Sequence, residues 1–243
     1  RFAISIPLLI LPLLSLVFLI IFVIVEYKAK NPILDLRMLG KNRLFLSTNL
    51  TALFMYTSHY NALVMISFYL QLIRLIDPTE AAFMLSAFPL TVVVTSIAVG
   101  KYSKLVSSRE LSALGMAIVA ISLLLMSRLT VTSSVLFIEV SLIIMGIGLS
   151  LFAAPNTNAN LSSVTSEDRS LANGMLGTMR HLGQSLSLAI GASTVGLFLS
   201  EDIYSVGGSI SVVEYVGGLS QAFFIGFIIA VIGIFIALIR GNK

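Results

Sequence analysis

Seven long apolar stretches constrain the fold of this chain more than any other feature. Each one approaches or exceeds the roughly 20 residues that a helix needs to cross the hydrocarbon core of a bilayer. They cover residues 4–25, 44–71, 80–100, 110–127, 132–154, 171–200 and 217–239. Within lipid, a helix satisfies all its backbone hydrogen bonds inside one segment, and the alternating segments of a membrane barrel are absent. The sequence therefore predicts an all-α integral membrane protein with seven transmembrane helices.

Charged residues are too scarce for a soluble protein. They make up 11% of the 243 residues, against 57% hydrophobic residues, whereas soluble domains carry about 25% charged residues. The net charge of +4 is too sparse for a phosphate-binding face, so no nucleic-acid partner is predicted. There is no Cys, and His59 and His181 lack the spacing of metal ligands. No enzyme motif or phosphate-binding loop occurs, so the sequence predicts neither catalysis nor a metal or other cofactor.

The cations of the connecting segments predict the orientation of the helices. With seven spans, eleven Lys and Arg residues fall on one side of the membrane and three on the other. Because positive loops stay in the cytoplasm, we expect a cytoplasmic C-terminus, an external Arg1 and a location in the cell membrane. The cytoplasmic set is Lys28, Lys30, Arg37, Lys41, Arg43, Lys101, Lys104, Arg109, Arg169, Arg240 and Lys243, and the external set is Arg1, Arg74 and Arg128.

The longest connection divides the chain. It covers residues 26–43 and is interrupted by Pro32 and Gly40. We therefore expect a single transmembrane helix at 1–25, a cytoplasmic linker at 26–43 and a six-helix unit at 44–243. Because the chain starts directly in an apolar stretch, we expect it to be the C-terminal portion of a longer polypeptide.

Four ordered motifs follow one another at consistent spacing. The segment 31–50 (NPILDLRMLGKNRLFLSTNL) begins the six-helix unit, and Tyr69, Leu70 and Gln71 lie at the end of its first helix. The segments 146–164 (GIGLSLFAAPNTNANLSSV) and 168–191 (DRSLANGMLGTMRHLGQSLSLAIG) follow. Together they resemble the fourteen-span drug–proton antiporters of the major facilitator superfamily (EmrB/QacA type). The resemblance covers nearly the whole chain.

This resemblance implies a fold and a function. The chain would be the last of two extra central helices followed by the C-terminal six-helix lobe, and its partner would be the missing N-terminal six-helix lobe. It implies proton-coupled efflux of small amphipathic or cationic compounds by alternating access, with the substrate, protons and the lipid bilayer as partners. Export of a specific metabolite, lipid or siderophore fits the same residues, as does a non-transporting receptor or scaffold that keeps the fold.

One cytoplasmic loop departs from the family pattern. Residues 100–111 (GKYSKLVSSREL) stand where the superfamily has a Gly-x-x-x-Asp-Arg-x-Gly type of motif. Gly100 and Arg109 fit it, but Lys104 stands at the Asp position and Ser107 at the second Gly position. We expect Lys104 and Arg109 to have gating or structural roles without an acidic latch.

Glu139 is the only carboxylate within the interior of a predicted span, since Glu80 and Glu110 stand at the very start of theirs. It lies about seven residues from the external end, or roughly 10 Å deep. A partly desolvated carboxylate has a raised proton affinity, so Glu139 is a candidate for proton coupling. The alternatives are a carboxylate in a water-filled external vestibule or one paired with a neighbouring helix.

His59 lies near the middle of the second predicted span, and Asn49 and Tyr56 share its helix face through steps of three and four residues. Such a His, beside a Tyr, suits a cavity wall where it could bind substrate or take up a proton. The alternative is a neutral His bonded to a neighbouring helix. We therefore predict Asn49, Tyr56 and His59, with Gln184, as candidates for the substrate cavity.

Small and polar residues form one continuous face of the sixth span. Its members are Asn173, Gly177, Arg180, Gln184, Ser187, Gly191 and Thr194. Such a face permits close helix packing, which we favour, or lines a translocation cavity. For Arg180 we expect a structural or gating role, paired with helix-end carbonyls or a lipid phosphate.

The segment 155–160 (PNTNAN) comes at the end of the fifth predicted span. Pro155 is expected to kink the helix or end it early. Asn156 and Asn158 would then lie at the cytoplasmic mouth, where they could form part of an inner gate. The alternative is an ordinary polar cluster that ends a helix.

Overall fold

The computed structural model describes most of the chain after residue 41. The described residues are 42–102, 106–199 and 211–239, with positions 14, 17–18, 20–21, 24–28 and 39–40. Most of the predicted first span at 4–25 and most of the linker at 26–43 lie outside them, and Lys104 does too.

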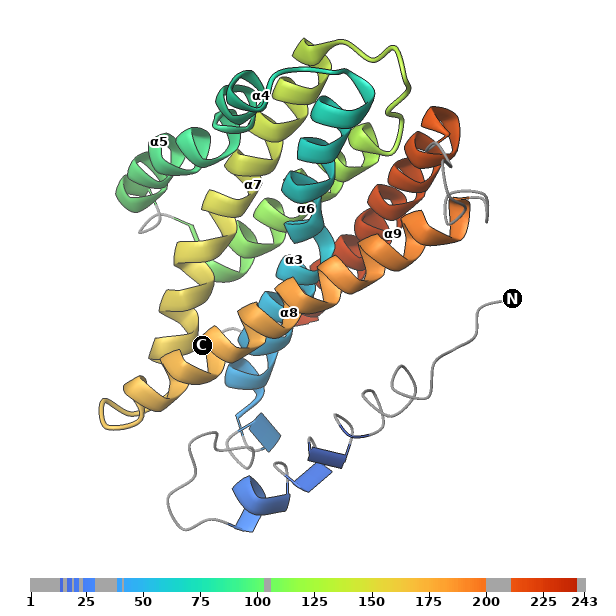
Figure 1. Cartoon of the computed structure of the whole chain (residues 1–243). Helices are drawn as coiled ribbons and strands as arrows, with labels where there is room; N and C mark the ends of the chain where they lie inside the picture. The colour runs from blue at the N-terminus through green and yellow to red at the C-terminus, as the bar shows by residue number, and fades with distance from the viewer. Residues whose placement is uncertain are drawn as a thin grey trace.

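The described part is built from seven α-helices, labelled α3 to α9, and one π-helical segment (Figure 1). They are α3 (Arg43–Phe68), the π-helix η1 (Tyr69–Ile73), α4 (Pro78–Leu85), α5 (Ala87–Tyr102), α6 (Ser108–Met126), α7 (Val135–Ser162), α8 (Arg169–Phe198) and α9 (Val212–Ile239). Helices therefore occupy all six predicted stretches from residue 44 onward. The all-α prediction is confirmed for the part of the chain that the structure describes.

The third predicted stretch is divided into two helices. Asp77 caps α4, and its side chain accepts a hydrogen bond from the Thr79 amide over 2.8 Å. The helix stops at Leu85, four residues before Pro89. Because proline has no amide hydrogen, the Leu85 carbonyl loses its helical donor there. The interruption therefore lies one turn before Pro89.

The predicted end of the fifth stretch at residue 154 is wrong. Helix α7 continues to Ser162 with Pro155 inside it, so Pro155 does not end the helix. Two further turns follow the proline, and the Thr157 hydroxyl donates back to the Ala153 carbonyl over 2.8 Å. Packing against neighbouring helices holds the segment helical, so the helix-ending alternative is excluded.

Helix α3 lies at the centre of the bundle. It packs against α8 and α9 along much of its length and against α7 at one end, while α6 packs between α7 and α9. Helix α5 packs on α7 at the edge of the bundle. Figure 1 shows α8 crossing the viewer's side of the bundle, with α4 and α5 away from it. One face of α8 is therefore left open.

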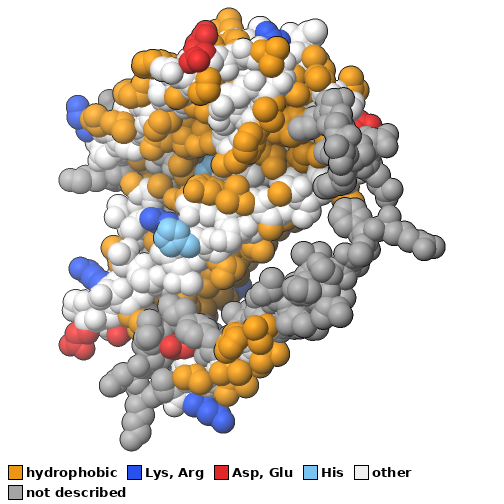
Figure 2. Space-filling view, viewed as in Figure 1, with side chains coloured by type: hydrophobic (Ala, Val, Ile, Leu, Met, Phe, Trp, Pro, Cys, Tyr) orange, Lys and Arg blue, Asp and Glu red, His pale blue; other side chains and the backbone are white. Residues whose placement is uncertain are grey.

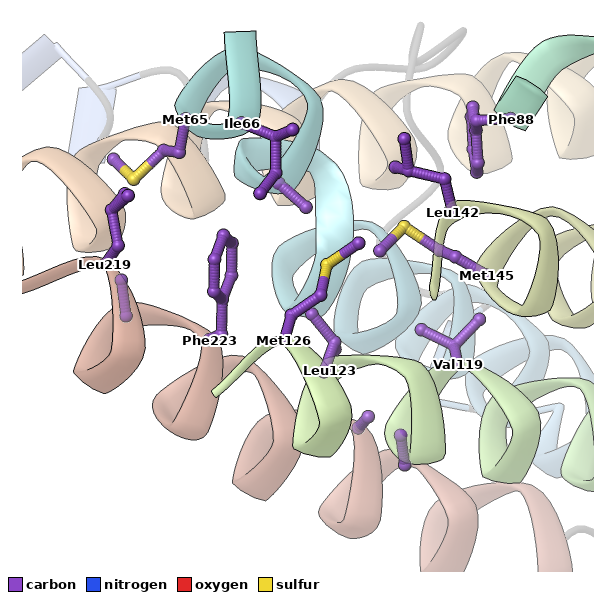
Figure 3. Packing of buried hydrophobic residues seen from close by; sticks show 14 of the residues in the cluster. Met65, Ile66, Phe88, Val119, Leu123, Met126, Leu142, Met145, Leu219 and Phe223 are labelled. Atoms are coloured by element: carbon purple, nitrogen blue, oxygen red, sulfur yellow. The ribbon is translucent and has the colours of Figure 1, made fainter. Parts of the chain in front are cut away.

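Apolar side chains from α3, α5, α6, α7 and α9 meet in one core (Figure 3). Leu123 and Phe223 are completely buried in it. Helices α6 and α7 approach especially closely, because a Cβ placed at Gly115 would lie 2.5 Å from the Gly148 carbonyl oxygen. Small residues therefore bring these two backbones together, as is common between helices in membranes.

Two long helices are more polar than the rest. Four helical segments are long and apolar enough to cross a membrane by themselves, namely Pro78–Lys101, Ser108–Met126, Val135–Ser162 and Val212–Ile239. Helices α3 and α8 are as long but carry more polar residues, and they pack against each other. Polar groups within membrane spans face a bundle interior or a water-filled cavity. The α3–α8 pair therefore marks the polar side of the bundle.

Candidate functional site

A guanidinium group from α8 meets side chains of α3 and α7 well inside the bundle. The Nη2 atom of Arg180 donates a hydrogen bond to Thr157 Oγ1 over 2.6 Å. The Cζ atom of Arg180 lies 5.8 Å from the centroid of the Tyr56 ring, within the ~6 Å range of a cation–π interaction. Tyr56 is near the midpoint of α3, so this contact lies at middle depth.

The partners of Arg180 differ from those expected from the sequence. The prediction of helix-end carbonyls or a lipid phosphate gives way to a hydroxyl group and an aromatic ring. The reason is that α8 runs alongside α3, so a side chain in the first half of α8 reaches the middle of α3. The Arg180 Nε atom is buried without a hydrogen-bond partner. Within the described residues, no carboxylate pairs with this cation.

An open hollow lies on another face of α8, and Arg180 is not among its lining residues. It is lined by Gly174, Gly177, Thr178, His181, Leu182 and Ser185. Gln184 is half-buried at its edge, and its Oε1 atom lies 3.0 Å from His181 Nδ1. Because an amide oxygen only accepts, His181 donates in this pair. Figure 2 shows a Lys or Arg and a His side chain next to each other, surrounded by polar and backbone atoms, on this face.

His59 is buried one turn along α3 from Tyr56. Only 4% of its surface is exposed, and its Nδ1 atom lies 2.7 Å from the carbonyl oxygen of Met55 in the same helix. Its ring centroid lies 5.6 Å from that of Tyr56 and 6.4 Å from that of Phe88 in α5. A carbonyl only accepts, so Nδ1 carries the hydrogen and Nε2 remains able to accept a proton.

The C-terminal part of the polar α8 face, from about residue 183 onward, packs closely against α3. The Asn61 amide donates to Ser187 Oγ over 3.0 Å. A Cβ at Gly191 would lie 2.5 Å from Asn61 Nδ2, and one at Gly183 would lie 2.7 Å from the Leu53 carbonyl oxygen. By contrast, a Cβ at Gly177 would meet nothing within 4 Å. Close packing is confirmed for the part of this face after residue 183, and the part before it is open.

An amide cluster joins α3, α7 and the start of α8 at one end of the bundle. Asn160 Oδ1 accepts hydrogen bonds from Thr48 Oγ1 over 2.8 Å and from Asn49 Nδ2 over 2.9 Å. Its own Nδ2 atom donates to the Ala172 carbonyl over 2.9 Å. Asn156 donates to the Thr48 carbonyl over 3.0 Å. The sequence analysis missed Asn160 and Thr48, although the four-residue spacing of Asn156 and Asn160 places both on one helix face.

This cluster changes the assignment of Asn49. The side chain is completely buried and donates to Asn160 and to the Phe45 carbonyl. It therefore does not line an open cavity in this conformation. Asn156 is also buried within the cluster, whereas Asn158 is exposed on the other side of α7. The structure separates these two asparagines because they are two residues apart on a helix, or about 200° around its axis.

Glu139 lies far from the Arg180 contact. It is half-buried in the second turn of α7, eighteen residues before Thr157, which corresponds to roughly 27 Å along the helix. No contact in the described structure joins Glu139 to His59. The two candidates for proton coupling are therefore separate sites.

Arg109, which was predicted to have a gating or structural role, lies in the first turn of α6.

These features define a class of protein before any comparison is made. The chain forms a multi-pass helical membrane protein with one polar helix pair, an open polar face and an intramembrane cation. Within the described residues, no group of His, Cys, Asp and Glu could hold a metal ion. Polar groups placed in this way mark a path for a solute rather than a catalytic centre.

The chain belongs to the Major Facilitator Superfamily, whose family model matches residues 44–242. It is 25% identical to the riboflavin transporter RibZ of Clostridioides difficile over 95% of the chain and 50% of that protein. It is 34% identical to an uncharacterized transporter, YebQ, of Escherichia coli over 58% of the chain and 30% of that protein. It is 27% identical to the multidrug transporter MdtP of Bacillus subtilis over 73% of the chain and 32% of that protein.

The chain thus spans half or less of the length of these relatives. Multidrug-type proteins are among them, so the resemblance to multidrug transporters is confirmed at the level of the superfamily and its relatives. A superfamily whose matched members are named transporters indicates transport and not enzymatic catalysis.

Proposed function

We propose that the protein containing this chain is a proton-coupled secondary transporter that exports small amphipathic compounds by alternating access. This chain supplies one wall of the substrate cavity, and an N-terminal six-helix lobe of the same polypeptide supplies the other. Transporters of this kind bind their substrates near the bilayer midplane, between two lobes that rock against each other.

The observation that carries this proposal is the contact between Arg180 and Tyr56 at middle depth. It lies between α3 and α8, the two helices that are too polar to face lipid alone. Charged groups inside spans are expensive and are kept chiefly where a solute or ion passes. The relatives named for multidrug transport and multidrug resistance support a transport function for this chain.

The proposed location is the plasma membrane, with the C-terminus in the cytoplasm. The excess of Lys and Arg in alternate connections supports this orientation. In this orientation the amide cluster around Asn160 lies at the cytoplasmic end of the lobe. Asn156 and Pro155 would then belong to the inner gate, together with Lys104 and with Arg109 in the first turn of α6.

For proton coupling we propose Glu139 and His59. Glu139 is the carboxylate within an apolar helix, and its half-buried position lets it exchange protons with the external side. His59 has one nitrogen held by Met55 and one able to accept a proton. The side chains of Tyr56 and Gln184 would contact the substrate, since both are half-buried next to the open part of α8.

The test uses the full-length polypeptide in proteoliposomes with an imposed pH gradient, and uptake of rhodamine 123 as the readout. We expect dye flux that collapses when the gradient is dissipated. Glu139→Gln and His59→Ala should each lower the pH-driven flux at least about tenfold, as loss of a catalysed proton transfer does. Glu80→Gln is the matched control, because Glu80 is an exposed carboxylate in the first turn of α4. Flux that persists without the gradient would exclude proton coupling.

Export of one metabolite is the second candidate. The riboflavin transporter matches 95% of this chain, a larger share than the multidrug relatives match. In the same vesicles, competition by riboflavin at micromolar concentration would favour this alternative. A set of unrelated amphipathic dyes that compete equally well would favour the multidrug type.

A further inference from the structure

We infer that the Arg180 face binds an anionic or acceptor-rich group of the transported compound, so that this wall favours compounds with such a group over purely cationic ones. The inference rests on the proposed transport function and names the chemistry that its substrate must carry. The observations are the hydrogen-bond donors of Arg180 that lack an acceptor and the positions of the acidic residues along α7 and α8.

Arg180 has more hydrogen-bond donors than the lobe uses. Its Nη2 atom donates to Thr157, whereas Nε is buried without a partner and Nη1 has none among the described residues. The Thr157 hydroxyl donates to the Ala153 carbonyl, so both of its roles are filled. Because Nε is buried, the donor that remains for a ligand is Nη1, and a charge-assisted hydrogen bond from it suits a carboxylate or a similar oxyanion.

The neighbouring side chains also offer donors. The Tyr56 hydroxyl makes no hydrogen bond with the described residues, and its ring lies against the guanidinium. The Tyr56 hydroxyl therefore remains free to donate to a ligand. His181 donates one ring nitrogen to Gln184 and lines the open hollow.

Acidic groups are distant from this wall. Along α8, the nearest carboxylate before Arg180 is Asp168, twelve residues away or roughly 18 Å. Along α7, Glu139 is eighteen residues from Thr157, or roughly 27 Å. A cationic ligand would therefore meet a like charge without a compensating carboxylate from α7 or α8. A lone cation in a membrane interior is costly, and an anionic ligand supplies its counter-charge.

The experiment compares two probes with the same xanthene ring system and opposite charge. Fluorescein is anionic at neutral pH, and rhodamine 123 is cationic. Equilibrium binding of each to the full-length protein in nanodiscs is measured by fluorescence polarisation. Arg180→Gln should weaken fluorescein binding at least about tenfold, since a charge-assisted hydrogen bond is lost. Binding of rhodamine 123 should be unchanged or tighter, which also shows that the variant is folded.

Two further variants separate recognition from a structural role. Arg180→Lys keeps the charge, so it should retain much more of the fluorescein binding than Arg180→Gln. Arg169→Gln removes an exposed cation from the first turn of the same helix and should change neither affinity. Fluorescein binding that survives Arg180→Gln, or an equal loss for both dyes, would overturn the inference. The pH-driven flux in proteoliposomes is a separate readout, so proton coupling can fail without affecting this result.

Discussion

Asn160 Oδ1 accepts a hydrogen bond from Asn49 Nδ2 over 2.9 Å, between helices α7 and α3. The same oxygen accepts from Thr48, and the Asn160 amide donates to the Ala172 carbonyl at the start of α8. One buried side chain therefore links α3, α7 and α8, although Thr48 and Ala172 are more than a hundred residues apart in the sequence. In alternating access, such a cluster holds one end of the lobe together as a rigid unit.

Replacing Asn160 by leucine should destabilise the lobe. Hydrogen bonds between membrane helices contribute about 0.6 kcal/mol each on average, and Asn160 makes three of them across helices. We expect Asn160→Leu to lower the free energy of unfolding by about 1–2 kcal/mol. The measurement is the thermal midpoint of the full-length protein in detergent. Asn158→Leu, on the exposed side of α7, is the control, and an equal effect of both changes would contradict the prediction.

Two glycines of α8 should respond to alanine in opposite ways. A Cβ at Gly183 would lie 2.7 Å from the Leu53 carbonyl oxygen, so the two backbones must move apart. We expect Gly183→Ala to destabilise the full-length protein by about 1–3 kcal/mol, as overpacking does. Gly177 faces open space, so Gly177→Ala should be neutral or stabilising by up to about 1 kcal/mol through helix propensity. Equal midpoints for the two variants in thermal unfolding would show that α3 and α8 do not pack as described.

Leu75 adopts a backbone conformation that disfavours its side chain. Its φ angle is 53°, and its side chain is 84% exposed in the turn between η1 and α4. The left-handed conformation costs a residue with a Cβ about 1 kcal/mol. Leu75→Gly should therefore raise the thermal midpoint or leave it unchanged, in spite of the greater entropy of the unfolded chain. Leu72→Gly, within the π-helix, should lower it, and a lower midpoint for Leu75→Gly would contradict the assigned conformation.

The cap of α4 should depend on pH. The backbone amide of Thr79 donates to the Asp77 carboxylate and holds the pKa of this group below its usual value of 3.8. A depressed pKa in the folded state means that the carboxylate stabilises the fold above pH 3.8 and that this contribution is lost as the pH falls through the lower, folded value. Amide exchange in α4, corrected for the intrinsic pH effect, should accelerate below that pH.

The matched variant for this cap is Asp77→Asn, which keeps a side-chain acceptor without a titratable group. In this variant, α4 should show no acid-dependent loss of protection. An acid response that persists in Asp77→Asn would assign it to another group, such as Glu80 in the first turn of the same helix.

Several features of the site were accessible from residue patterns. Six apolar stretches predicted where the helices from residue 43 onward lie, because a span in lipid must bond its own backbone. The polar break near Arg128 separates α6 from α7 as expected, since α6 ends at Met126 and α7 begins at Val135. The face that includes Ser187 and Gly191 was also visible, because its spacing of three and four residues reflects helical geometry alone.

Other features needed contacts between helices. The sequence placed Asn49 on the same face as Tyr56 and His59, but helix spacing does not reveal which part of a face a neighbour covers. Helix α7 covers Asn49, whereas α8 leaves Tyr56 half-exposed. Likewise, Pro155 suggested the end of a helix. The sequence shows that proline removes one backbone hydrogen bond, but it does not show the packing that keeps the helix intact. Packing against α3 and α8 extends α7 to Ser162.

The sequence by itself determined that this chain lies in a membrane, that its described segments are helices and that few charges fall inside them, because each of these properties follows from the cost of polar groups in lipid. Tertiary structure alone decided which polar residues meet. It placed Arg180 against Tyr56 and Thr157, and it joined Asn160 to Thr48 and Asn49. These contacts depend on how far one helix is shifted along another, and that shift is set by the fit of small residues such as Gly183 and Gly191 against α3.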